Sequence, residues 1–464
     1  MPTIEQLSAM EILDSRGRPT VSATCRLAGG VAATASVPSG ASTGRAEALE
    51  LRDGDPRRYG GLGCRNVVGH VNREINTALA GRSFAAQADL DRALIDLDGT
   101  ANKSKLGANA ILAVSLAFAR AAAAAAGLPL YRHFADILGE TLRTLPRLTV
   151  NLFSGGKHAG EQVAIQDVLV VPAGAQTIDK GLATVYAVYQ AAAKLTHDKY
   201  GMRALTADEG GLAPAFASDE AMLQDAVAAI RAAGFEPGRE VALAVDVASS
   251  HFYRDGRYHL AGGSLDSGQM INHLRDWVRR YPIVSVEDGL AEDDWNHWPA
   301  LRREIGGEAP ARNGMIGPAG SRSHPDYNQS HTGQRRSHTG SDPTGGVLVL
   351  GDDLLCTNPQ RIRRAIETDA ATALLLKVNQ IGTVTEAAEA LRLARSAGWH
   401  ITISARSGET EDNWLADLAV GWAGEQIKVG SITQSERLAK YNRLLAIEAQ
   451  TRLPVVGWPG DRIG

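Results

Sequence analysis

Short apolar runs that end in a charged residue recur through the second half of the chain. Four apolar residues lead into Lys377, and a similar run leads into Glu287. A short, continuous apolar run predicts a β-strand that is buried on both faces. Six such segments follow one another along the chain, at residues 241–246, 283–287, 347–353, 373–377, 401–406 and 426–428. The sequence between them is mostly helical in pattern, which predicts a parallel (β/α) barrel with its chemistry at the carboxyl ends of the strands.

A charge at a single strand end is explained equally well as a cap. Six charges in series, with three acids before two lysines and an arginine, favour a shared site. The barrel pattern is irregular where it begins. The runs 148–152 and 168–171 are too close for a helix between them and predict an antiparallel pair. Helices are predicted at about 177–199 and 218–233.

The amino-terminal part of the chain has a different pattern. Residues 3–37 alternate between apolar and polar side chains, which predicts a small antiparallel sheet. The glycine- and hydroxyl-rich segment 38–44 is either a plain surface turn or a loop with hinge freedom. Residues 107–126 are rich in alanine and predict a closely packed helix. We therefore expect an α+β domain at 1–140 and a barrel domain at 141–464.

One region, at about 309–346, interrupts the alternation of strands and helices. It is rich in Gly, Ser, Pro, His and Arg, and His324, His331 and His338 fall seven residues apart. A metal site is one interpretation, but a solvated flexible insertion explains the composition better. The region follows a helix predicted at about 292–305 and precedes a strand, which places it on the amino-terminal face of the barrel.

Composition limits the classes of function. The 464 residues are 44% hydrophobic, which is enough for a large core, and the net charge of −4 gives no electrostatic footprint for nucleic acid. Three scattered cysteines favour a reducing, cytoplasmic location over a disulfide framework. The first residues lack the features of a signal peptide, and the most apolar run, at 121–126, is too short to span a bilayer. We expect neither a nucleic-acid nor a membrane partner.

Three predicted strands end in acids, namely Asp246, Glu287 and Asp352. Hard oxygen ligands that converge at one end of a barrel suit Mg²⁺ better than a softer metal. The alternative is that two acids cap strands and the third forms a salt bridge. On the following strands, Arg406 with Ser407 suits a phosphate, because the guanidinium forks onto oxygens and the hydroxyl donates.

The remaining two cations have separate predicted roles. Lys428 suits a carboxylate. Lys377 lies between the acids and the other cations, and nearby positive charge favours its neutral amine, which makes it a candidate general base. Together these residues suggest proton abstraction next to a carboxylate, with one or two Mg²⁺ ions stabilising the charge that develops. Glu209, on a glycine-flanked loop, is a candidate acid for a leaving group; the alternative is a solvated loop acid.

These residues stand in long motifs that resemble the enolase family, the phosphopyruvate hydratases. The similarity runs from Asp14-Ser15-Arg16-Gly17 to residues 435–440, which is almost the whole chain. The most specific motifs are those at 39–44, 104–110, 208–211, 375–382 and 406–410. Their length and number exclude chance similarity.

The resemblance implies an α/β fold: a C-terminal (β/α)8-type barrel of the enolase kind, with an antiparallel second strand, and a smaller N-terminal α+β domain. It also implies a homodimer, a small phosphorylated carboxylate as substrate and two Mg²⁺ ions per active site. By this resemblance Asp246, Glu287 and Asp352 are ligands of the first ion, and Ser42 reaches the second ion when its loop closes. Lys377 is the base and Glu209 the acid. The substrate-binding residues are His158, Gln166, Asp167, Arg406, Ser407 and Lys428.

Three positions depart from the family pattern. Asp167 replaces a glutamate, so the acid that supports Glu209 through water is one methylene shorter. Ala405 replaces a histidine beside the phosphate and the leaving group. Gly289 replaces a proline, which we expect to loosen a loop at the mouth of the barrel.

Three readings of the function follow. The first is an enolase that converts 2-phosphoglycerate to phosphoenolpyruvate and water. The second is an enolase-like enzyme whose pocket is enlarged at Ala405 and Asp167 for another phosphorus acid, similar to the enzymes of phosphinate-antibiotic pathways that make carboxyphosphonoenolpyruvate. The third is a non-catalytic binding or structural protein on the same fold, which the retained Lys377, Glu209 and metal ligands argue against.

Overall fold

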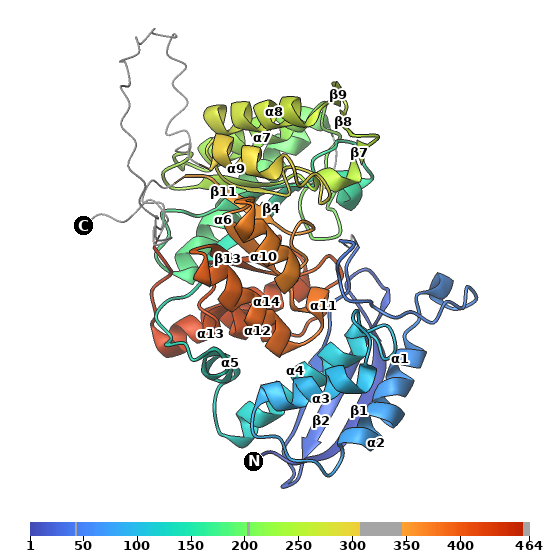
Figure 1. Ribbon diagram of the computed structural model, residues 1–464. Coiled ribbons are helices and arrows are strands. Elements are labelled where there is room, and N and C mark those ends of the chain that lie inside the picture. Colours follow the sequence, from blue (N-terminus) through green and yellow to red (C-terminus); the bar gives the residue numbers. More distant parts are fainter. Residues whose placement is uncertain (42–43, 202–204, 307–345, 458–464) are drawn as a thin grey trace, which may run out of the picture.

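The computed structural model of the chain describes residues 1–41, 44–201, 205–306 and 346–457. Ser42, the predicted ligand of a second Mg²⁺, lies outside these residues, as do residues 309–345 of the predicted insertion with its three histidines. The described chain forms an amino-terminal α+β part and a barrel (Figure 1).

The amino-terminal part is built on a three-stranded antiparallel sheet, as the alternating pattern predicts. Its strands are β1 (Ile4–Leu13), β2 (Pro19–Leu27) and β3 (Ala32–Ser36). The helices and single turns that follow are η1 (Tyr59–Gly61), α1 (Arg65–His70), η2 (Val71–Ile75), α2 (Asn76–Leu79), α3 (Gln87–Asp98), α4 (Ala108–Ala125) and α5 (Leu130–Leu138).

Helix α4 is the alanine-rich helix that the sequence predicts. Its apolar run at 121–126 is short, but the complete helix of 18 residues is long and apolar enough to pass for a membrane span by length and composition. It is 83% buried inside the protein and packs against β2 and β3. Because alanine side chains are small, the helix and sheet approach each other closely. Helix α4 is therefore the core helix of the amino-terminal part.

Eight of the described strands close a barrel in the order β10-β11-β12-β13-β14-β4-β5-β6. Their bounds are β4 (Arg147–Ser154), β5 (Asp167–Val171), β6 (Ala242–Asp246), β10 (Ile283–Glu287), β11 (Leu348–Gly351), β12 (Ala373–Leu376), β13 (His400–Ser404) and β14 (Gln426–Gly430). Strand β5 runs antiparallel to both β4 and β6, and the other pairs are parallel. The antiparallel start that the short spacing predicts is confirmed. All residues of β4, β6 and β10 are buried, which explains their continuous apolar character.

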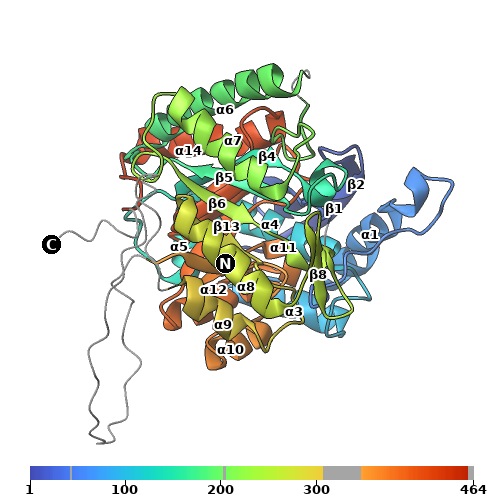
Figure 2. The ribbon, with the colours of Figure 1, turned by 90° about the horizontal axis from the view of Figure 1, so that it is seen from above.

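Helices surround these strands (Figure 2). They are α6 (Ile178–Tyr200), α7 (Asp219–Ala232), α8 (Ser267–Arg280), α9 (Trp298–Ile305), α10 (Pro359–Glu367), α11 (Val378–Ile381), α12 (Val384–Ser396), α13 (Trp414–Gly421) and α14 (Ser435–Thr451), with the turns η3 (Gly156–Ala159) and η4 (Ser249–His251). Side-chain caps begin several of them. The side chains of Thr177, Asp266 and Thr383 each accept a hydrogen bond from the backbone N–H three residues on.

A small antiparallel sheet between β6 and α8 is absent from the sequence prediction. It consists of β7 (Tyr253–Arg254), β8 (Arg257–Leu260) and β9 (Gly263–Leu265). The signal was present, because Asp255-Gly256 is a favoured two-residue hairpin turn and both residues have positive φ, 50° and 75°.

The amino-terminal part covers the end of the barrel at which the parallel strands finish. Ser39 and Gly408 exchange two backbone hydrogen bonds, of 2.8 and 3.0 Å. Arg16 Nη1 donates to Ser407 Oγ at 3.0 Å. Segments far apart in the sequence therefore meet at this mouth, and any site there is built by both parts of the chain.

Candidate active site

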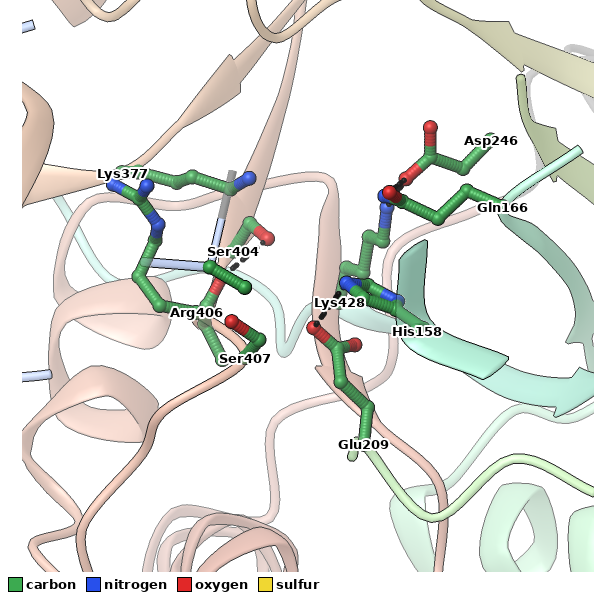
Figure 3. Close-up of a pocket in the computed structure, with 11 residues that line it drawn as sticks. His158, Gln166, Glu209, Asp246, Lys377, Ser404, Arg406, Ser407 and Lys428 are labelled. Atoms are coloured by element: carbon green, nitrogen blue, oxygen red, sulfur yellow. Dashed lines mark hydrogen bonds and ion pairs between the residues drawn. The ribbon is translucent and has the colours of Figure 1, made fainter. Parts of the chain in front are cut away.

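A cavity opens at the mouth of the barrel and encloses about 340 Å³, part of it open to solvent. Eight predicted site residues line it: His158, Gln166, Glu209, Asp246, Lys377, Arg406, Ser407 and Lys428. Figure 3 shows Lys377, Arg406 and Ser407 on one side and Asp246, Gln166, His158 and Glu209 on the other. Asp167, Glu287 and Asp352 are buried behind this lining, and each bonds to one of its members.

The barrel topology explains how these residues reach one place. Asp246 and Glu287 are the last residues of β6 and β10, and Lys377 directly follows β12. Asp167 is the first residue of β5, and it reaches the same mouth because this strand is antiparallel. Lys428 was predicted to end its strand, but it is the third residue of β14. Its long side chain crosses to the carboxylates of other strands.

Two buried lysines pair with the three predicted metal ligands. Lys428 Nζ lies 2.8 Å from Asp246 Oδ2 and 2.7 Å from Glu287 Oε2. Lys377 Nζ lies 2.5 Å from Asp352 Oδ2. Buried carboxylates are costly unless they are paired, and the ammonium groups supply the countercharge.

The three acids do not form one tight group in this arrangement. Within the described ranges, the clusters with all ligand atoms inside 4.8 Å are His158-Asp167-Glu209 and Asp288-Asp352-Asp353. Asp246 and Glu287 are joined through the ammonium of Lys428, and Asp352 is held by another lysine. Because Lys428 and Lys377 each attract their own carboxylates, the three acids are not drawn together around one positive charge.

The donor set nevertheless fits a hard divalent cation. Glu287 Oε1 is buried and has no hydrogen-bond partner among the described residues. Burial and the charge of Asp246 raise the pKa of Glu287 well above its ordinary value, although Lys428 opposes this. For Asp246, Lys428 outweighs burial and lowers the pKa. The ammonium of Lys428 therefore compensates the charge of Asp246 more fully than that of Glu287. Carboxylate oxygens are the ligands that suit Mg²⁺.

The second acidic group has a structural explanation. The carboxylate of Asp288 accepts the backbone N–H groups of Asp352 at 3.0 Å and Asp353 at 2.7 Å. It thereby holds the turn after β11. Gly289 lies in the loop after β10, and the expectation that it loosens that loop stays a prediction. A Cβ atom there would lie 2.9 Å from Leu274 and 3.0 Å from Leu301, so the glycine is closely packed.

The electrostatics of Lys377 differ from the sequence prediction. Burial and the cations Arg406 and Lys428 favour the neutral amine, as expected. The attraction of Asp352 is stronger, and the pKa of Lys377 lies above its ordinary value. The expectation of a neutral amine is therefore wrong for this metal-free arrangement, because the sequence does not show that Asp352 contacts the amine.

The predicted phosphate ligands are also engaged. Arg406 Nη1 lies 3.0 Å from Glu47 Oε2 and donates to Asn379 Oδ1 at 3.0 Å. Ser407 Oγ accepts from Arg16. Glu47 and Arg16 were not predicted as site residues, although both lie within or next to the motifs that carry the resemblance. An anionic substrate group at Arg406 has to compete with the carboxylate of Glu47.

His158, Asp167 and Glu209 form a second charged cluster. His158 Nδ1 lies 3.1 Å from Asp167 Oδ2, and Nε2 lies 3.9 Å from Glu209 Oε1. Burial opposes the charged ring, but the two acids raise the pKa of His158 to about 9. Burial also opposes the charge of Glu209, but His158 and other cations outweigh it and lower its pKa. The cluster therefore favours a charged ring at His158 and an ionised Glu209, while burial raises the pKa of Asp167 although His158 opposes this.

A closed barrel that gathers charged side chains at the carboxyl ends of its strands is typical of barrel enzymes. Family models agree with this class. The model described as "Enolase, N-terminal domain" matches residues 4–134, and "Enolase, C-terminal TIM barrel domain" matches residues 142–309 and 336–454. The chain belongs to the enolase family. The unmatched stretch, 310–335, falls within the insertion predicted at 309–346.

Replacement of Lys428 by methionine tests the charge pairing. The change leaves Asp246 and Glu287 buried without their ammonium, so we expect the metal-free protein to lose about 3–5 kcal/mol of unfolding free energy. Addition of Mg²⁺ should restore part of the loss, because a cation replaces the missing charge. Urea unfolding with and without Mg²⁺ measures both effects.

Arg45 provides the control, since its side chain is 77% exposed and pairs with Asp293 at the surface. Arg45→Met should cost about 1 kcal/mol or less. Equal losses for the two variants would contradict the importance of the buried pairing.

Proposed function

We propose that the protein is a Mg²⁺-dependent lyase that abstracts the C2 proton of 2-phosphoglycerate and eliminates water to give phosphoenolpyruvate. Family membership supports the class of reaction. The observation that carries the proposal is the placement of Lys377 and Glu209 on opposite sides of one cavity (Figure 3). A substrate between them presents one carbon to the proposed base and the neighbouring carbon to the proposed acid.

Asp246, Glu287 and Asp352 are the residues that would hold Mg²⁺. When bound, the cation would supply positive charge beside the substrate carboxylate, and the three acids, paired with it, would attract the lysines less. Lys377 then loses the attraction that keeps it protonated, and the remaining influences of burial, Arg406 and Lys428 favour the neutral amine that a general base requires.

The other lining residues bind and orient the substrate in this proposal. Arg406 and Ser407 bind the phosphate after the side chain of Glu47 gives way, and Lys428 binds the carboxylate. His158 and Gln166 complete the lining of the pocket, and Asp167, buried behind it, holds His158. Gln166 donates to Asp246 at 3.1 Å, while its own Oε1 is buried without a partner in the described chain. Ser42 remains the proposed ligand of a second Mg²⁺ ion.

Deuterium exchange and dehydration test the proposal separately. With 2-phosphoglycerate and Mg²⁺ in D₂O, we expect exchange of the C2 proton, measured by NMR, and formation of phosphoenolpyruvate, measured by its absorbance. Lys377→Ala should abolish both, because the base is lost. Absence of exchange by the wild type, with Mg²⁺ shown to bind, would favour the non-catalytic reading.

A second candidate is an enolase-like enzyme of phosphonate or phosphinate biosynthesis, similar to the enzymes that make carboxyphosphonoenolpyruvate. Ala405 favours it, because this small side chain lines the cavity where the family has a histidine. Asp167 favours it too, since the short acid is drawn back to Ser154 and His158. C2 exchange without dehydration of 2-phosphoglycerate would support this candidate.

We further propose a homodimer in the cytoplasm. Met10 and Leu13 on β1, with Tyr59 and Leu62, are exposed apolar side chains. Arg58 joins β1 to Tyr59, because it pairs with Glu11 and covers the tyrosine ring. Exposed apolar patches mark interaction surfaces. The cysteines Cys25, Cys64 and Cys356 are free and buried, which suits a reducing compartment.

Light scattering coupled to gel filtration measures the assembly. We expect a molar mass of two chains for the wild type, and a shift toward one chain for Leu13→Asp, because the charge disfavours burial of the patch. A wild type that elutes as a single chain at micromolar concentration would contradict the dimer.

A further inference from the structure

Ser154 belongs to the acid side of the cavity, although neither the sequence motifs nor the cavity lining points to it. Its Oγ donates to Asp167 Oδ1 at 2.5 Å. The other oxygen of Asp167 lies 3.1 Å from His158 Nδ1. Ser154 and Asp167 are fully buried. Both oxygens of the short acid are therefore occupied, one by the serine and one by the ring.

Ser154 also supports the loop that carries Glu209. Its backbone N–H donates to Leu212 O at 2.9 Å, and Leu212 in turn donates to Leu152 O at 2.8 Å. A Cβ atom added to Gly211 would lie only 2.4 Å from Ser154 Oγ, so the loop packs directly on this hydroxyl. One serine at the end of β4 thus fixes Asp167 and the Glu209 loop relative to each other.

The ring of His158 lies between Asp167 and Glu209. With Nδ1 held by Asp167, its Nε2 faces Glu209 Oε1 at 3.9 Å. The raised pKa of the ring, about 9, agrees with a proton held there at neutral pH. Other charged or titratable groups also act on the cluster. Asp246 and His251 interact with His158, while Lys428, Arg437 and Lys377 act on Glu209. Lys428 also acts on Asp167.

We propose that Ser154 and Asp167 are positioning residues that fix His158 with Nε2 toward Glu209, and that His158 supplies the proton that Glu209 delivers in the elimination. This inference rests on the proposed function. The N–H bond at Nε2 breaks as the two groups approach, and an O–H bond forms at Glu209 Oε1. The ring becomes neutral and keeps its Nδ1–H on Asp167. Glu209 passes the proton to the departing hydroxyl, which leaves as water, and the ring takes a new proton from solvent.

The proposal predicts different effects on two steps, C2 proton exchange and dehydration, and both can be measured with 2-phosphoglycerate. Abstraction of the C2 proton uses Lys377 on the opposite side of the cavity and does not need the cluster. We therefore expect Ser154→Ala to lower dehydration about tenfold and Asp167→Asn about a hundredfold, in line with general-acid effects, while C2 exchange is retained. Exchange and dehydration are measured on the same samples of the full chain with Mg²⁺.

Ser115→Ala is the matched control. Ser115 is equally buried, and its Oγ accepts from Gln87 at 3.0 Å and from the backbone of Val384 at 3.2 Å, away from the cavity. This variant should change neither rate. Equal losses of exchange and dehydration in Ser154→Ala and Asp167→Asn, or unchanged dehydration in both, would overturn the proposal.

The ring itself gives a readout that needs no turnover. In ¹⁵N NMR spectra the pKa of His158 should fall from about 9 in the wild type toward its ordinary value in Asp167→Asn, because the acid that favours the charged ring is removed. An unchanged pKa would overturn the positioning role. If the wild type neither exchanges nor dehydrates 2-phosphoglycerate, the proposed function fails, and with it the delivery step, while the NMR result still decides the positioning.

Discussion

The pairing of two buried lysines with three buried carboxylates at the mouth of the barrel is the interaction on which the rest of the site depends. Lys428 joins Asp246 and Glu287, and Lys377 holds Asp352. Charged groups stay buried only when they are compensated. The strands of the barrel hold these five side chains together, and the other residues of the cavity lie around these pairs.

The charged residues of this site come from many parts of the chain, and the barrel topology brings them together. Parallel strands bring their carboxyl ends to one mouth, and the reversed β5 adds Asp167 to the same place. The amino-terminal part contributes Glu47, whose carboxylate pairs with Arg406, and Arg16, which contacts Ser407. Different segments therefore build the two sides of the cavity, with Lys377, Arg406 and Ser407 on one side and Asp246, His158 and Glu209 on the other. The carboxylate of Glu47 pairs with Arg406, the proposed phosphate ligand.

Much of this arrangement follows from the sequence. Apolar runs that end in charges predict the barrel and the strand-end positions of Asp246 and Glu287, because burial on both faces leaves a continuous apolar signal. The roles of Asp288, Glu47 and Ser154 could not be predicted, since they depend on contacts between distant segments. The same reason explains the error at Lys377. Neighbouring charges along the chain suggested a neutral amine, whereas a single contact with Asp352 decides its protonation.

The most direct measurement of the central claim is a crystal structure with Mn²⁺ in place of Mg²⁺, in which anomalous scattering locates the ion. The account predicts one strong peak bound by oxygens of Asp246, Glu287 and Asp352, with the amine of Lys428 moved away from both of its carboxylates. A peak bound by His158, Asp167 and Glu209 instead, or saturating Mn²⁺ with Lys428 still between Asp246 and Glu287, would contradict it.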